Sequence, residues 1–126
     1  YYLLALGTGL VERVYWWRLI ARGYGLISPE SDGSLRGRPA WDALRTLIDQ
    51  VEGATFNGPL PAPEGAFLYS FKCDEREVVV GWSVATGARA KLPCPASEAV
   101  SRDGRSVPVT GQVEIELGPS PVYYRI

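Results

Sequence analysis

The residues that could do chemistry in this 126-residue sequence are few. It contains no histidine, and its only cysteines are Cys73 and Cys94. Zinc sites depend mainly on cysteine and histidine, and a serine or cysteine nucleophile usually relies on a histidine base. The sequence therefore predicts no metal site, no catalytic triad and no cofactor.

The two cysteines allow two interpretations. Cys73 and Cys94 could form a disulfide that closes a loop of roughly 20 residues, which would stabilise the fold by about 3 kcal/mol. Two buried free thiols are the alternative, because an unpaired cysteine behaves as a small apolar side chain. The sequence alone leaves both open.

Composition and charge are those of a globular chain without a strong electrostatic field. Hydrophobic residues make up 46% and charged residues 21% of the sequence, which argues against disorder. Thirteen basic residues nearly balance fourteen acidic ones, and the net charge of -1 would not attract nucleic acid or an anionic membrane. We expect neither partner. Because Tyr1 is preceded by no initiator methionine and opens no signal-peptide pattern, we also expect the chain to be part of a longer polypeptide.

The first 53 residues combine helical and buried-strand patterns. Residues 1–12 are apolar on almost every side, as in a helix enclosed by other elements. Residues 13–20 are aromatic and β-branched on both faces, the pattern of a strand buried in a parallel sheet. A loop rich in Gly and Pro follows over 21–39. Pro39 then opens a helix whose apolar residues recur at helical spacing until Gly53.

After Gly53 the apolar period changes from helical to two, which predicts a domain boundary. Alternating residues over 67–73 and 78–84 predict an antiparallel hairpin. Six or seven short strands at regular turn spacing predict a small β-sandwich. The further strands are expected within 88–92, 98–107, 113–117 and 122–126.

The order of these elements resembles the end of a (β/α)8 barrel with an appended sandwich. Residues 14–17, 23–27 and 38–44 resemble the eighth strand, loop and helix of clan A glycoside hydrolases of the xylosidase-like families. The closing residues 121–124 resemble the last strand of their C-terminal sandwich. This resemblance covers essentially the whole chain. It implies an α+β fragment in which residues 1–53 end a (β/α)8 barrel and residues 54–126 form an antiparallel β-sandwich.

The resemblance implies a protein that cleaves O-glycosidic bonds of a polysaccharide or oligosaccharide. In that clan the two catalytic glutamates lie at the ends of the fourth and seventh barrel strands, which would precede Tyr1. Glu12 and Glu30 do not replace them, because retaining hydrolysis needs two carboxyl groups about 5 Å apart and neither residue lies at the end of the expected strand. The chain alone is therefore expected to be non-catalytic, and to require the missing N-terminal barrel portion or another copy of the chain as a partner.

The resemblance also implies carbohydrate binding by five residues at and after the expected barrel strand. Trp16 or Trp17 could supply a platform for a sugar ring, and Trp17 is the better candidate because it lies nearer the strand end. Arg18, Arg22 and Tyr24 could bind sugar hydroxyls or a carboxylate of an acidic polysaccharide. The alternative is that both tryptophans pack, that Tyr24 holds the loop and that the arginines are solvated or ion-paired.

A different class of function remains open, namely a non-catalytic carbohydrate-binding or structural β-sandwich module. Its binding face could be formed by Tyr69, Trp82 and Tyr123. Their positions on alternating strands favour packing in the core instead.

Overall fold

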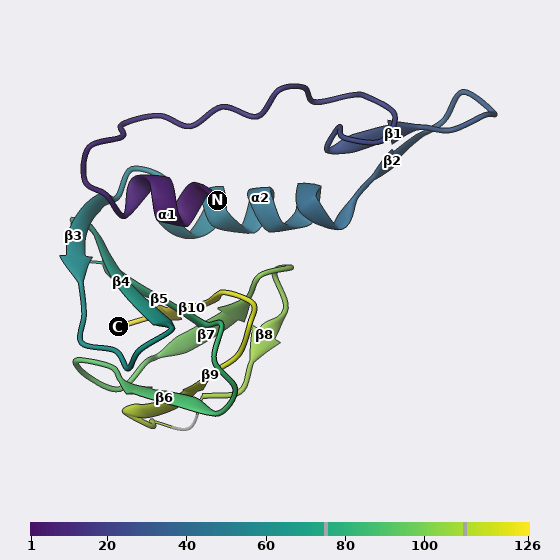
Figure 1. Ribbon diagram of the computed structural model, residues 1–126. Coiled ribbons are helices and arrows are strands. Elements are labelled where there is room, and N and C mark those ends of the chain that lie inside the picture. The colour runs from purple at the N-terminus through teal and green to yellow at the C-terminus, as the bar shows by residue number, and fades with distance from the viewer. Residues whose placement is uncertain (75, 110) are drawn as a thin grey trace.

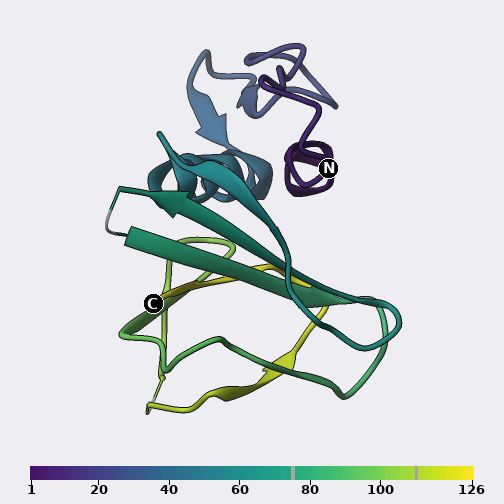
Figure 2. The same ribbon diagram turned by 90° about the vertical axis from the view of Figure 1, so that its left-hand side faces the viewer.

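Three layers make up the architecture of the computed structural model, which describes residues 1–74, 76–109 and 111–126. The helices lie on one face of a six-stranded sheet, and a two-stranded sheet lies on its other face (Figure 2). Every strand pair described is antiparallel. The expected α+β class is confirmed, and the facing sheets are compatible with the expected β-sandwich.

The six-stranded sheet is the middle layer and contains the predicted hairpin. Its longest strands pair in a register that places Phe67 opposite Trp82. The sequence predicted this hairpin because apolar residues alternate along both strands. In spatial order the strands are β3 (Thr55–Pro59), β4 (Ala66–Cys73), β5 (Arg76–Ser83), β10 (Val122–Arg125), β7 (Glu98–Ser101) and β8 (Ser106–Val107).

A two-stranded sheet of β6 (Ala88–Lys91) and β9 (Glu114–Leu117) closes one core against the six-stranded sheet. Inward-facing residues of β9 alternate with charged residues on its outer face, as expected for a half-buried strand. Gly81 on β5 lies where the core leaves no room for a side chain. A Cβ at this position would be 2.7 Å from Leu117 Cδ2 and 2.9 Å from Leu68 Cδ1. The core residues are Leu68, Val79, Ala90, Leu92, Ala96, Ala99, Ile115, Leu117 and Tyr124.

The helices α1 (Tyr2–Leu6) and α2 (Pro39–Val51) close a second core on the opposite face of the same sheet (Figure 1). Pro39 starts α2 at a position where its missing N–H costs nothing, and Asp42 in the first turn suits the positive end of the helix dipole. This second core consists of Leu3, Leu47, Phe71, Val78, Val80, Trp82 and Tyr123. The helices thus share a core with strands on the other side of the boundary expected at residue 53.

The N-terminal elements differ from their predictions in three places. The first helix is only five residues long, and Gly7 and Gly9 follow it directly. The loop over 21–39 contains a hairpin of β1 (Ile27–Pro29) and β2 (Leu35–Gly37). The predicted strand over 13–20 is wrong for this chain: residues 11–19 form no strand, and only Ile20 makes an isolated bridge, to Ile27. A parallel strand needs neighbouring strands, and the described residues place none beside 11–19.

The disulfide interpretation is also wrong, because both thiols are free. Cys73 is half-buried and Cys94 is exposed, so the alternative of two buried thiols does not hold either. Exposed Cys94 gains little from apolar packing.

Candidate functional site

The segment before the β1–β2 hairpin crosses above the helices (Figure 1). It borders an apolar groove. Val14, Tyr15, Trp16 and Leu19 line one wall of the groove, whose volume is about 480 Å3. The other wall comes from α1 and α2, through Tyr2, Leu6, Trp41, Leu44, Leu47, Ile48 and Val51. Helix α2 therefore turns one apolar side to the sheet and a second one to this groove.

The two neighbouring tryptophans have opposite surroundings. Trp16 lines the groove, and its indole Nε1 donates a hydrogen bond to the Tyr24 carbonyl oxygen at 3.2 Å. Trp17 is outside the groove lining and is 81% exposed. Three consecutive residues, Val14, Tyr15 and Trp16, line the groove, and the backbone bends at Trp17. Both platform candidates are exposed, Trp16 to 43% and Trp17 to 81%, so Trp17 is the more open of the two.

The loop after Trp17 is held mainly through its backbone. Arg18 Nε donates to the Ile20 carbonyl oxygen at 3.0 Å. Arg38 Nη1 donates across 15 residues to the Gly23 carbonyl oxygen at 2.5 Å. Tyr24 takes part through its carbonyl group, while its side chain is exposed. Sequence reasoning missed Arg38, because a side chain that bonds a distant backbone carbonyl leaves no pattern in residue spacing.

The predicted site residues Trp17, Arg18, Arg22 and Tyr24 therefore all lie in one short exposed stretch. Arg22 is exposed in the turn between Ala21 and Tyr24. Guanidinium and phenol groups can donate to hydroxyl or carboxylate oxygens, so the stretch offers an aromatic face together with hydrogen-bond donors. This combination suits a polar ring-shaped ligand.

The carboxylates that the sequence analysis set aside remain apart in the structure. Glu30 pairs with Arg36, with Oε1 and Nε 3.0 Å apart, where the turn that joins β1 to β2 begins. Glu12 borders a different hollow, of about 490 Å3, together with Phe56 and Phe71. Among the described residues, no group of three or more histidine, cysteine, aspartate or glutamate side chains could hold a metal ion.

The aromatic residues of the sandwich are core residues. Trp82 and Tyr123 are buried under the helices, and Trp82 stacks on Phe67 with ring centroids 4.9 Å apart. Tyr69 meets Trp82 edge-on at 5.2 Å. Burial raises the pKa of the Tyr123 phenol above its usual value. The preference for core packing over an exposed sugar-binding face is confirmed for Trp82 and Tyr123.

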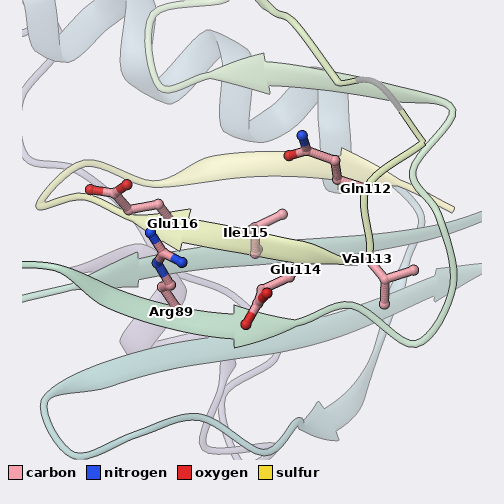
Figure 3. Close-up of a pocket in the computed structure, with 6 residues that line it drawn as sticks. All are labelled: Arg89, Gln112, Val113, Glu114, Ile115 and Glu116. Atoms are coloured by element: carbon pink, nitrogen blue, oxygen red, sulfur yellow. The ribbon is translucent and has the colours of Figure 1, made fainter.

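A hollow of about 500 Å3 lies on the outer side of β6 and β9, and no pattern in the sequence pointed to it (Figure 3). Arg89, Gln112, Glu114 and Glu116 line it with exposed side chains of both charges. Ile115 alternates with the two glutamates and belongs to the core. Val113 and Ile115 also line the hollow, but no aromatic ring does, so it offers no stacking platform.

Comparison with protein-family models, curated proteins and solved structures finds no match to this chain. Within the residues that the structure describes, neither helix has the length and apolar character required to cross a bilayer.

Proposed function

We propose that this chain is the C-terminal part of a glycoside hydrolase that cleaves O-glycosidic bonds of a polysaccharide or oligosaccharide. The catalytic glutamates lie outside this sequence. The chain contributes a sugar-stacking tryptophan and a loop to a site that another portion completes.

The observation that carries the proposal is the difference between Trp16, which lines the groove, and the more exposed Trp17, which does not. In a (β/α)8 barrel, alternate residues of each strand face the interior and the surrounding helices. Val14, Tyr15 and Trp16 line the groove opposite α1 and α2, whereas Trp17 lies outside the groove lining and is more exposed. In the proposed whole protein, the groove would be the layer between the barrel portion and its helices, and Trp17 would lie on the side where substrate binds.

The loop residues supply the polar part of the proposed site. A sugar ring has an apolar face that can stack on an indole and hydroxyl groups at its edge that need hydrogen-bond partners. Arg18 follows Trp17 directly, and its bond to Ile20 uses Nε, which leaves its two terminal nitrogens available to a ligand. Arg22 and Tyr24 are exposed in the same loop.

The helices would join the proposed barrel portion to the sandwich. Leu3 and Leu47 pack into the core shared with the six-stranded sheet. Leu6, Leu44 and Ile48 line the groove on the other side. A helical layer with two apolar sides can pack against both portions. We propose that the sandwich braces the barrel portion through this layer.

The proposal is tested by titrating the chain with neutral and acidic oligosaccharides while recording the indole N–H resonances of its four tryptophans. We expect the Trp17 signal to shift and the Trp82 signal to stay, because Trp82 is buried. Trp17→Ala should abolish the response, and Trp41→Phe serves as the matched control in the groove. Chromogenic glycosides should give no turnover.

Two results would contradict the proposal. Turnover by the isolated chain would show that catalytic residues lie within it. Binding that survives Trp17→Ala would favour the competing function, a carbohydrate-binding sandwich module that works without a barrel.

A further inference from the structure

The chain exposes more surface than a folded chain of its mass requires. Its accessible surface is 8052 Å2 for 13.8 kDa. Folded monomers of this mass expose about 6,600 Å2, so the excess is roughly 1,400 Å2. A standard protein interface covers about 800 Å2 on each partner. Exposed large apolar residues are concentrated in one stretch, residues 10–20, and comprise Leu10, Val11, Tyr15, Trp16, Trp17, Leu19 and Ile20.

The backbone of this stretch is also free to pair. Among the described residues, none forms a backbone hydrogen bond with residues 11–18. Exposed, unpaired backbone of high strand propensity can act as a template for strand addition, and here pairing would straighten the bends at Glu12 and Trp17. The unpaired stretch therefore offers backbone donors and acceptors together with apolar side chains.

The residues of the stretch are complementary to those of a second copy in one antiparallel register. If Tyr15 lies opposite the Tyr15 of the other copy, Glu12 lies opposite Arg18 and Arg13 lies opposite Trp17. Twofold symmetry makes each contact twice. The register thus creates two acid–base pairs and two guanidinium–indole pairs without placing like charges opposite one another.

The register decides which side chains share a face, and it requires Tyr15, which lines the groove beside Val14 and Trp16, to turn to the other face on pairing. Val14 and Trp16, which line the groove, would lie opposite each other on one face. Trp17, which is open, would lie with Arg13 on the other face. On one face two apolar side chains would meet, and on the other a guanidinium group would meet an indole ring.

We infer that residues 12–18 form an interface between two copies of this chain, paired as antiparallel strands centred on Tyr15. The contact needs only the exposed stretch, so its formation by the chain alone does not depend on the proposed function. A preceding barrel portion would cover the same residues and would compete with the second copy.

Sedimentation equilibrium over a range of protein concentrations tests the inference. We expect a monomer–dimer equilibrium. Glu12→Arg or Arg18→Glu alone should weaken it by about tenfold or more, because each change sets like charges opposite one another twice. The double variant Glu12→Arg with Arg18→Glu should restore dimerisation. Charge reversal of Arg89 or Glu116, exposed on the far sheet (Figure 3), is the matched control and should have no effect.

A cross-linking experiment checks the register. Only Tyr15 would face its own counterpart, so Tyr15→Cys in a Cys94→Ala background should form an intermolecular disulfide on mild oxidation. Val14→Cys in the same background should not, because its partner position is Trp16. A chain that stays monomeric at all concentrations, or a dimer that is indifferent to Glu12 and Arg18, would overturn the inference and leave the proposed function standing.

Discussion

Arg125 on β10 joins the sheet to helix α2 through Gln50, with Arg125 Nε donating to Gln50 Oε1 at 3.1 Å. The same guanidinium pairs with Glu98 on β7, with Nη1 and Oε2 2.7 Å apart. Gln50 is buried, so its amide oxygen depends on this donor. One arginine thus holds two layers together.

Removing this donor should destabilise the fold more than removing its charged partner. Arg125→Ala leaves the buried Gln50 oxygen without its partner, and we expect a loss of about 1–3 kcal/mol in the free energy of unfolding. Glu98→Gln removes a half-exposed ion pair and should cost about 1 kcal/mol or less. Urea denaturation of both variants measures the difference, and equal losses would contradict the role assigned to Gln50.

Gly81→Ala should destabilise the contact between the two facing sheets. A Cβ at this position would overlap Leu117 and Leu68, and overpacking of this kind costs about 1–3 kcal/mol. Gly118→Ala is the matched control, because no atom lies within 4 Å of a Cβ at that position. Thermal unfolding should show a lower midpoint for Gly81→Ala alone.

Stability should fall at alkaline pH through the buried tyrosines. Burial raises the pKa of both Tyr123 and Tyr124, so the folded state holds their protons more tightly than the unfolded state does. Stability from this source is complete below a pH of about 10, the pKa of an unfolded tyrosine, and decreases as the pH rises above it. Denaturation at several pH values should show a smaller alkaline loss for Tyr123→Phe than for the unchanged chain.

The two neighbouring tryptophans should differ in their effect on stability. Trp16→Ala removes a hydrogen bond and a groove contact, and we expect a loss of about 1 kcal/mol. Trp17→Ala should change the free energy of unfolding by less than about 0.5 kcal/mol, because its ring is exposed. A large loss for Trp17→Ala would show that this residue has a packing role.

The sequence predicted elements whose signals are local. Helix α2 has its start at Pro39 and a regular apolar spacing, and the β4–β5 hairpin has alternation on both strands, so each pattern is complete within its own residues. The strand expected over 13–20 depends on neighbours that the described chain does not place beside it. The composition of residues 13–20 is typical of a buried strand, whereas the structure shows this segment exposed.

The covering of the six-stranded sheet on both faces has its signal in the apolar run Val78, Val79 and Val80. A continuous apolar run is typical of a strand covered on both faces, whereas strict alternation would indicate a strand covered on one face only. Only part of the candidate site was predictable: the sequence placed Trp17, Arg18, Arg22 and Tyr24 in one stretch, but it could not show that Trp16 and Trp17 have opposite surroundings.

Strand β5 belongs to both cores at once, through Val79 on one face and Val78 and Val80 on the other. Neither the helical layer nor the small sheet can detach without exposing valines of this strand to water. The two outer layers should therefore melt together in a single transition. The amide protons of β5 should be the slowest to exchange with deuterated solvent, since they open only when the whole assembly does.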